Sequence, residues 1–282
     1  MDLGLQDRVA LITGASGGIG QALAAGFTAE GARVALQARQ RHAALEAFAA
    51  ESLPPDSFLL LSADVTRPAE IEGAIDQAAL HFGRLDACIV NAGIWPPESL
   101  RLDQLSPARI RETLEVDLLG AIWTARAFMQ QLARRKPAPA RRGASLTLIG
   151  STAGRFGERG HADYAVSKAG LYGLVRSLKN EIVALDPEGR VNMVEPGWTA
   201  TPMAEGTLHD RAAIRRAIRT MPLQRVATAA DIARAVLFLS SPAAAAHITG
   251  EVLTVAGGME GRVQWESEQV DAAGIQRRLG IA

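Results

Sequence analysis

Cysteine is nearly absent from this sequence of 282 residues, because Cys88 is the only one. An intrachain disulfide is therefore impossible, and a reducing, cytoplasmic location is expected. No run approaches the roughly 20 apolar residues of a transmembrane helix, which argues against a membrane-spanning protein. Lys plus Arg equal Asp plus Glu at 30 each, so no net charge attracts nucleic acid or an anionic membrane. The histidines lack metal-ligand spacing with carboxylates or Cys88, so no metal site is expected.

Short apolar runs alternate with helical patterns along most of the chain. The runs that are typical of buried strands cover residues 9–13, 34–37, 58–62, 85–90, 146–149, 191–194 and 252–255. The first helical pattern follows the glycine-rich turn and ends near residue 30. Further helical patterns cover residues 41–50, 68–82, 107–135 and 161–185. Buried strands that alternate with helices predict an α/β domain of the doubly wound type, with a seven-stranded parallel sheet flanked by helices.

Two segments depart from this alternation. Residues 134–142 are basic and interrupted by proline, a composition that favours a solvated surface loop over an anion-binding site. After Gly258 the strand pattern stops. We therefore expect one domain over residues 1–259, followed by a C-terminal tail at 260–282.

A glycine-rich turn, TGASGGIG at residues 13–20, lies between the first strand and the first helix. Gly14 allows a tight exit from the strand, Gly18 leaves the backbone open to a pyrophosphate, and Gly20 lets helix and strand pack closely. The helix N-terminus adds free N–H groups and a favourable dipole. Glycines alone are a weak signal, but their place after a buried strand predicts a dinucleotide site.

Ser151, Tyr164 and Lys168 form a second candidate group. Tyr164 and Lys168 are four residues apart, which places them on one face of a helix. Ser151 follows a strand end, where open α/β sheets bind ligands. Tyrosine, with an ordinary pKa near ~10, needs a nearby cation such as Lys168 to exchange protons near neutral pH.

These motifs together resemble the short-chain dehydrogenase/reductase family. The resemblance extends over roughly residues 5–258 and includes Asp64-Val65, Asn91-Ala92-Gly93 and the segment PGWTAT at 196–201, all in the family's order. It implies a single Rossmann-type domain. It also implies a hydride transfer between a dinucleotide and a ketone or secondary alcohol.

The resemblance assigns a role to each matching residue. Tyr164 would be the general acid/base, Lys168 would lower its pKa and bind the nicotinamide ribose, and Ser151 would orient the carbonyl. The cofactor would contact Gly14, Ser16, Gly18, Ile19, Gly20, Arg39, Asp64, Val65, Asn91, Ala92, Gly93, Tyr164, Lys168, Pro196, Gly197, Trp198, Thr199 and Thr201.

Asp117 is the one marked departure from the family. The family usually carries asparagine in an Asn-x-x-Gly stretch of the fourth helix, where it supports a water that relays protons to the lysine. Here the stretch is Asp117-Leu-Leu-Gly120. An ionised carboxylate near Lys168 would compete with the tyrosinate for the positive charge. Asp117 is therefore a candidate catalytic-site residue.

The end of the second strand bears on the choice of cofactor. An acidic residue there would bind the ribose of NAD, whereas this chain has Ala38-Arg39. The guanidinium fork suits a 2′-phosphate, so NADP(H) is favoured and NAD(H) remains an alternative. Arg39 stacked on adenine or exposed to solvent is the competing interpretation. Gly17, where many NADP enzymes of the family carry a basic residue, does not support NADP.

Aromatic residues follow several strand ends and would line the substrate side. The candidates are Trp95, Ser151, Phe156, His161 and Trp198. They favour an apolar or ring-bearing carbonyl compound, although aromatic residues in such loops also pack against one another. His161 also suits the start of a helix.

The leading interpretation is an NADP(H)-dependent oxidoreductase acting on a small carbonyl or alcohol substrate. The alternatives are an NAD-dependent sugar or other alcohol dehydrogenase and a catalytically idle dinucleotide-binding sensor or scaffold. Relatives commonly pair the helices at 107–135 and 161–185 across a two-fold axis, so a homodimer or homotetramer is expected. The tail, with Trp265 as an apolar anchor, would then reach a neighbouring subunit or be a frayed terminus.

Overall fold

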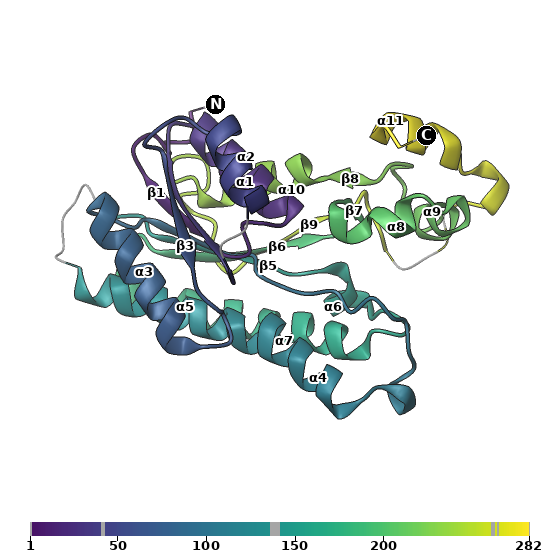
Figure 1. The fold of residues 1–282 in the computed structure, drawn as a ribbon, viewed down its shortest axis with the longest axis horizontal. Coiled ribbons are helices and arrows are strands. Elements are labelled where there is room, and N and C mark those ends of the chain that lie inside the picture. The colour runs from purple at the N-terminus through teal and green to yellow at the C-terminus, as the bar shows by residue number, and fades with distance from the viewer. Residues whose placement is uncertain (1, 41–42, 136–141, 261–262, 264, 282) are drawn as a thin grey trace.

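The computed structural model describes residues 2–281 apart from 41–42, 136–141, 261–262 and 264. Its centre is a seven-stranded parallel sheet with the strand order β3-β2-β1-β4-β5-β6-β9 (Figure 1). The strands are β1 (Val9–Ile12), β2 (Arg33–Ala38), β3 (Phe58–Ser62), β4 (Ala87–Val90), β5 (Ser145–Ile149), β6 (Arg190–Pro196) and β9 (Val252–Val255). The predicted doubly wound α/β fold is therefore confirmed.

Helices cover both faces of this sheet. One face carries α1 (Gly18–Ala29), α2 (Ala43–Ser52) and α10 (Ala229–Ser240). The other carries α3 (Pro68–Phe82), α5 (Gly120–Arg134) and α7 (Ala162–Glu181), with α4 (Pro107–Leu114) leading into α5 (Figure 1). Among the residues described, no helix combines the length and the apolar character needed to cross a membrane.

Strand β1 shows how the sequence builds this three-layer core. Its side chains alternate between the two faces, as the period of two in a strand requires. Val9 and Leu11 belong to the buried cluster under α3, α5 and α7, whereas Ala10 and Ile12 belong to the cluster under α1, α2 and α10. Because both faces are covered, every residue of the strand is buried and apolar.

The strand order reverses beside β1, which pairs with β2 on one side and β4 on the other. The connections leaving the carboxyl ends of β1 and β4 therefore diverge to opposite faces of the sheet. Such a switch point opens a crevice at the carboxyl ends of the strands, where ligands of open α/β sheets bind. The glycine-rich turn and Asn91-Ala92-Gly93 both begin there.

The helix predicted over 107–135 contains a break in its regularity. It begins at Pro107 behind a Ser106 cap, whose hydroxyl accepts a hydrogen bond from the Arg109 N–H. Between α4 and α5, Glu115–Leu119 form a π-helical turn. Such wide turns insert an extra residue and are frequent at functional sites. Asp117 lies in the middle of this one.

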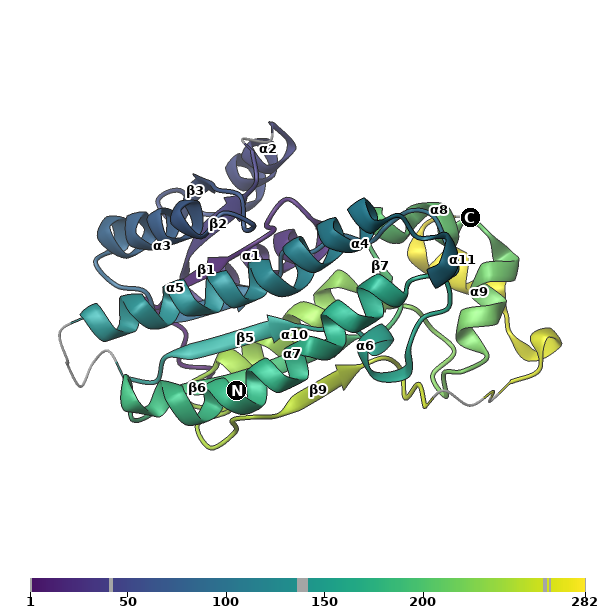
Figure 2. The ribbon, with the colours of Figure 1, turned by 90° about the horizontal axis from the view of Figure 1, so that it is seen from below.

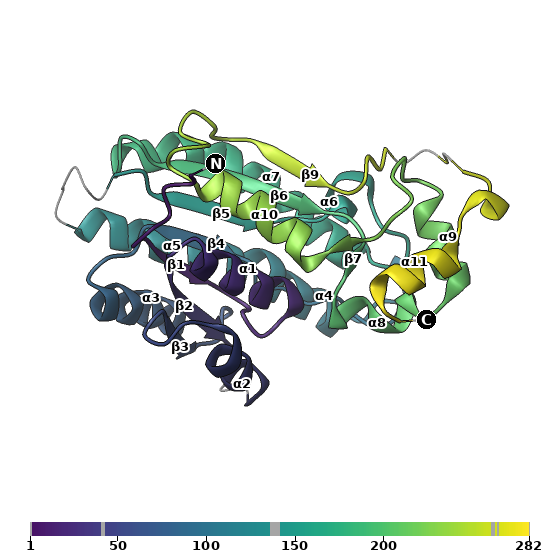
Figure 3. The ribbon, with the colours of Figure 1, turned by 90° about the horizontal axis from the view of Figure 1, so that it is seen from above.

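Several elements were not predicted. They include α6 (Thr152–Phe156) and a lobe outside the main sheet that contains β7 (Thr199–Ala200), α8 (Glu205–Leu208), α9 (Arg211–Ile218) and β8 (Ala227–Thr228). Another is α11 (Ala272–Leu279), which packs against α9, so the described part of the tail is ordered on its own chain (Figure 3). Residues 41–42 of the second predicted helix and 136–141 of the basic segment lie outside the described residues.

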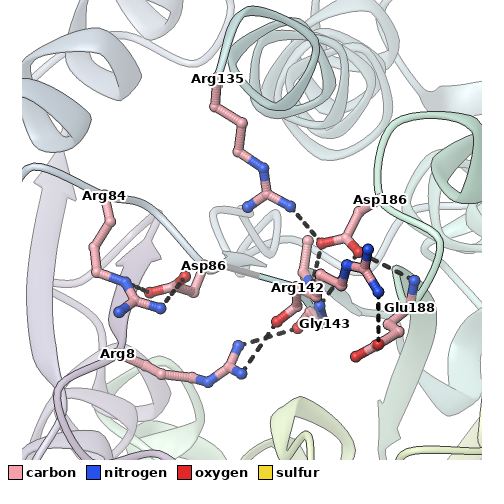
Figure 4. Close-up of polar contacts among 9 residues, drawn as sticks. Arg8, Arg84, Asp86, Arg135, Arg142, Gly143, Asp186 and Glu188 are labelled. Atoms are coloured by element: carbon pink, nitrogen blue, oxygen red, sulfur yellow. Dashed lines mark hydrogen bonds and ion pairs between the residues drawn. The ribbon is translucent and has the colours of Figure 1, made fainter. Parts of the chain in front are cut away.

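At the amino ends of the strands, buried charged groups fasten the chain on either side of the basic segment (Figure 4). The Asp186 carboxylate pairs with Arg135 and accepts hydrogen bonds from the N–H groups of Gly143 and Ala144. The Arg8 guanidinium donates to the carbonyl oxygens of Arg142 and Gly143 at 3.1 and 3.2 Å. These groups already have protein partners, which supports a structural role for the described ends of this segment.

Candidate active site

A cleft of about 610 Å³ opens at the carboxyl ends of the strands around β1. It is lined by these residues of the predicted cofactor set: Gly14, Ser16, Arg39, Asp64, Val65, Ala92 and Gly93. Further lining residues that the sequence analysis did not single out are Gln37, Gln40, Thr66, Ile94, Glu112, Glu115 and Val116. Gln37 could have been identified from the sequence, because a polar residue inside an apolar strand indicates a functional position. Glu112 and Glu115 gave none, because only the packing of α4 brings them to the cleft.

The glycine-rich turn has the close approaches that its sequence predicts. Gly14 has a φ of +63°, and a Cβ there would lie 2.7 Å from the Ala92 Cα. A Cβ on Gly20 would lie 2.6 Å from the Ala15 Cα. Both contacts are too short for any side chain, so only glycine fits these positions. The turn therefore keeps its backbone exposed to the cleft.

Helix α1 begins at Gly18 without a side-chain cap on its N-terminal N–H groups. Free N–H groups at a helix N-terminus form a ready site for an anion such as a diphosphate. Behind the turn, the Asn91 side-chain amide donates to the carbonyl oxygens of Thr13 and Gly14 at 2.8 and 3.1 Å. Asn91 thus braces the turn from behind.

The loop at 196–202 meets the glycine-rich turn from the other side. It leaves β6 at Pro196, and a Cβ on Gly18 would lie 3.0 Å from the Pro202 Cδ and 3.3 Å from the Thr201 Cβ. The Thr199 hydroxyl is turned back onto the Gly197 carbonyl oxygen at 3.0 Å. The structure therefore brings this predicted cofactor segment beside Gly18.

The rim of the cleft is polar at the end of β2. Ala38 is buried, whereas Arg39 is exposed. Across from it, Asp64 accepts hydrogen bonds from the backbone and hydroxyl groups of Thr66 at 2.9 and 2.8 Å. Burial would raise the pKa of Asp64, but these bonds and the charge of Arg39 outweigh it and lower the pKa. Asp64 is therefore held as a carboxylate, and Arg39 offers a cationic donor at the rim.

Tyr164, Lys168 and Ser151 come together at the same edge of the sheet. Helix α7 places the Lys168 Nζ 5.5 Å from the centre of the Tyr164 ring. Ser151 caps α6, with its hydroxyl accepting from the Ala153 N–H at 3.2 Å. The Ser151 side chain also lowers the pKa of Tyr164. The unpredicted α6 is therefore the element that aims Ser151 at Tyr164.

The electrostatics of this group work against an easily ionised tyrosine. Burial raises the pKa of Tyr164, and the charge of Asp117 raises it further, whereas Lys168 and Ser151 act in the opposite direction. Burial would lower the pKa of Lys168, but the charges of Asp117 and Tyr164 raise it above its ordinary value. Lys168 is thus held as an ammonium group, with Asp117 as the main group that raises its pKa.

Asp117 points into the site. Its Oδ1 accepts a hydrogen bond from the Ile94 N–H at 2.7 Å, and its Oδ2 lies 3.8 Å from the Lys168 Nζ. The side chain is fully buried, and Oδ2 has no hydrogen-bond partner among the described residues. Gly93 makes this approach possible, because a Cβ there would lie 3.1 Å from the Lys168 Nζ.

We predict that Asp117→Asn shifts the pH dependence of alcohol oxidation. Asparagine keeps the acceptor for the Ile94 N–H but removes the charge that competes for Lys168. The tyrosinate should therefore form more easily. The rise of kcat/KM with increasing pH should then occur at lower pH. A shift of about one pH unit corresponds to about 1.4 kcal/mol of interaction.

The measurement is kcat/KM for oxidation against pH in both proteins. Glu112→Gln is a matched control, since it removes a carboxylate from the cleft lining one turn earlier in the helix run. Glu112→Gln should not change the pH at which kcat/KM rises. Superimposable profiles for the parent and Asp117→Asn would contradict the prediction.

The structure brings only some of the candidate substrate residues close to Tyr164. Trp95 stacks on His161 with ring centres 3.9 Å apart and meets the Tyr164 ring edge-on at 4.8 Å. His161 is buried immediately before α7, and its Nε2 lies 3.1 Å from the Pro96 carbonyl oxygen. Both interpretations of His161, helix start and site wall, thus describe its position. Phe156 is 41% exposed and contacts Arg155 instead of the Tyr164 group.

Comparison with known proteins places this geometry among related chains. The family described as Enoyl-(Acyl carrier protein) reductase matches residues 14–260. The chain is 34% identical over 254 residues to carbonyl reductase family member 4 of Danio rerio, covering 90% of this chain and 98% of that protein. It is 35% identical over 258 residues to the 3-oxoacyl-acyl-carrier-protein reductase FabG of Escherichia coli, covering 91% and 99%.

A solved structure gives the same picture in three dimensions. The short-chain dehydrogenase/reductase of Brucella melitensis described as a glucose/ribitol dehydrogenase superposes with a TM-score of 0.81 at 30% identity. The match covers 92% of this chain and 99% of that one. The two chains therefore share the same fold over nearly their whole lengths.

Proposed function

Since the chain belongs to the short-chain dehydrogenase/reductase family of hydride-transferring oxidoreductases, we propose that it interconverts a ketone and a secondary alcohol with NADP(H). The observation that carries this proposal is the group around Tyr164. The Lys168 Nζ lies 5.5 Å from the centre of the Tyr164 ring, and both Lys168 and Ser151 lower the pKa of Tyr164. This arrangement suits proton exchange with a substrate oxygen.

The proposed mechanism gives each residue of this group one task. Nicotinamide supplies the hydride in the reduction. Ser151 donates a hydrogen bond that holds the carbonyl oxygen beside Tyr164, and the Tyr164 hydroxyl gives this oxygen its proton. The Lys168 ammonium stabilises the resulting phenolate, which solvent reprotonates. In the oxidation the phenolate removes the alcohol proton, so protons and electrons balance in both directions.

The cleft fits a dinucleotide in three respects. The bare backbone at Gly14 and the uncapped start of α1 suit a diphosphate. The Lys168 ammonium lies at the inner end of the site, where a nicotinamide ribose would be held. Arg39, next to the small Ala38, supports a 2′-phosphate at the outer end.

The substrate class rests on the aromatic wall and on the relatives. Trp95, set against Tyr164 and His161, gives the substrate side an apolar surface. Two relatives are named for reductions of carbonyl and 3-oxoacyl groups. We therefore infer that a ketone with an apolar or ring-bearing substituent is preferred over a polar sugar alcohol.

Steady-state assays with NADPH and NADH against a panel of ketones test this function. The panel should contain aliphatic, cyclic and aromatic ketones, 3-oxoacyl thioesters and, in the reverse direction, sugar alcohols. Turnover of a ketone with NADPH preferred is the expected result. Turnover only of sugar alcohols with NAD, or tight cofactor binding without any turnover, would overturn the proposal in favour of a sugar dehydrogenase or a sensor.

We also propose that the protein forms a homodimer through α5 and α7, the helices on which a dimer was expected. A shallow groove of about 360 Å³ lies between them, with an apolar lining that includes Ile122, Met129, Leu174 and Leu185. Gly173, also on α7, has open space where a Cβ would lie, so a second helix could approach closely at this residue. Light scattering at micromolar concentration should give at least twice the chain mass, and a monomer would contradict the assembly.

A further inference from the structure

The lobe between β6 and α10 is built from elements that are too short to be stable alone. Its elements are short: β7 and β8 have two residues each, α8 has four and α9 has eight. Helices of this length are not stable in water without tertiary packing. Something outside the lobe must therefore hold it in place.

The C-terminal segment supplies the missing half of the core of this lobe. A third apolar cluster, separate from the two at the sheet faces, contains these lobe residues: Leu208, Ile214, Ile218, Met221 and Val226. The segment after Gly258 adds Val270, Ala272 and Ile275 as fully enclosed members. Figures 2 and 3 agree that α8, α9 and α11 gather beyond one end of the main sheet.

Trp265 joins the two parts by hydrogen bonds as well as by packing. Its indole Nε1 donates to the Met221 carbonyl oxygen at 2.7 Å. Its backbone N–H donates to the Arg219 carbonyl oxygen at 3.2 Å, and the Arg219 Nε donates back to the Trp265 carbonyl oxygen at 3.1 Å. The segment is thus fixed to the end of α9.

Gln276 makes a second connection at the start of α9. Its buried Nε2 donates to the carbonyl oxygens of Leu208 and His209 at 3.3 and 3.2 Å. Its Oε1 accepts from the Arg211 Nε at 2.9 Å. The Gln276 side chain therefore donates to two carbonyl oxygens between α8 and α9. It also holds the side chain of Arg211, the first residue of α9.

The lobe is continuous with the candidate active site. Trp198 lies on the 196–202 loop and packs against the third cluster. A few residues later, Thr201 and Pro202 lie against Gly18 of the glycine-rich turn. In the proposed function this loop borders the nicotinamide end of the cofactor. A displacement of the lobe would therefore move that wall of the site, whereas Arg39 and Asp64 at the adenosine end lie on the main sheet and would stay in place.

We propose that the C-terminal segment is a positioning element of the substrate site, in which Trp265 and Gln276 hold the 197–226 lobe over the nicotinamide end. This inference rests on the proposed function for its kinetic consequences. It makes Trp265 and Gln276 positioning residues, because they act through the lobe and do not touch the reacting atoms. It also assigns to the tail a task within its own subunit.

Gln276→Ala and Trp265→Ala test the proposal. Each should raise KM for the ketone by about tenfold, since losing one or two net hydrogen bonds changes an equilibrium by roughly that factor. The Kd of 2′,5′-ADP, which probes only the adenosine end, should stay within about twofold of the parent. Gln276→Glu keeps the acceptor for Arg211 but sets a carboxylate oxygen against the Leu208 and His209 carbonyl oxygens, so it should raise KM at least as much as Gln276→Ala.

Trypsin provides a readout that does not depend on turnover. The lobe contains Arg211, Arg215, Arg216 and Arg219, so loosening it should speed cleavage there in both alanine variants. Arg277→Ala is the matched control, because Arg277 is on α11 but its side chain is 66% exposed and pairs with Asp271 of the same segment across 3.8 Å. It should behave as the parent in both assays.

The outcomes separate this inference from the proposed function. Unchanged KM and unchanged lobe cleavage in both alanine variants would overturn the positioning role. A parallel loss of 2′,5′-ADP binding would also overturn it, because the damage would then be global. If the parent turns over no ketone but the variants are cleaved faster within the lobe, the proposed function fails and the structural role of the tail remains.

Discussion

Tyr164→Phe is expected to reduce kcat for ketone reduction by at least about a hundredfold, the range attributed to a positioned proton donor. The ring would stay in contact with Trp95 and only the hydroxyl would be lost. NADPH should therefore bind with nearly unchanged Kd. The measurements are single-turnover rates under saturating substrate and a fluorescence titration of the cofactor.

The second tyrosine of the chain is a matched control. Tyr172 lies two helical turns further along α7, and its hydroxyl donates to Glu195 Oε2 at 2.9 Å. Tyr172→Phe removes the same group from the same helix away from Ser151 and Lys168, so turnover should persist. If Tyr164→Phe kept turnover within a few-fold of the parent, the proton would come from another group and the proposed mechanism would be wrong.

Arg39→Asp is expected to reverse or abolish the preference for NADPH. The substitution would remove the charge-assisted hydrogen bond that we propose to a 2′-phosphate, and it would place a like charge at the rim of the cleft. Losing the bond alone is worth about 1.5–3 kcal/mol, so the ratio of kcat/KM for NADPH to that for NADH should fall on the order of 100-fold. Both cofactors should be compared with the same ketone.

Arg67→Asp tests whether this effect is local. Arg67 also lowers the pKa of Asp64 beside the cleft, but it is mostly exposed and pairs with Glu70 at 2.9 Å. Its substitution changes the charge of the rim by the same amount at a different place. An unchanged cofactor ratio in Arg39→Asp, or an equal change in Arg67→Asp, would show that Arg39 does not contact the phosphate.

The main sheet could be predicted because its signals are local. The segments 58–62, 68–82 and 252–255 agree with β3, α3 and β9 at both ends. Continuous apolar runs mark the strands, and Pro68 marks the first turn of α3. The order of strands and their register came only from the structure, since pairing depends on contacts between distant segments.

Most of the elements that were missed have signals that are short or tertiary. The exception is α10, which was also not predicted although it has twelve residues and a capping box at Thr228. Helix α6, at five residues, is too short to show a helical period, and the lobe is built from still shorter pieces. The tail looked separate because its apolar residues pack against α9 instead of the sheet. Within the site, the pairing of Tyr164 with Lys168 could be read from their spacing, whereas the place of Ser151 on α6 could not.

The π-helical turn at 115–119 sets which side chains of α5 face the same way as those of α4. Each residue of an α-helix advances its side chain by about 100°, so one inserted residue rotates everything downstream by that angle. Upstream, Arg109 reaches Asp163 beside Tyr164; downstream, Ile122 and Met129 line the groove between α5 and α7. A one-residue deletion within the turn would rotate these two surfaces relative to each other. The deletion would therefore turn the groove relative to the Tyr164 group even if Asp117 itself were kept.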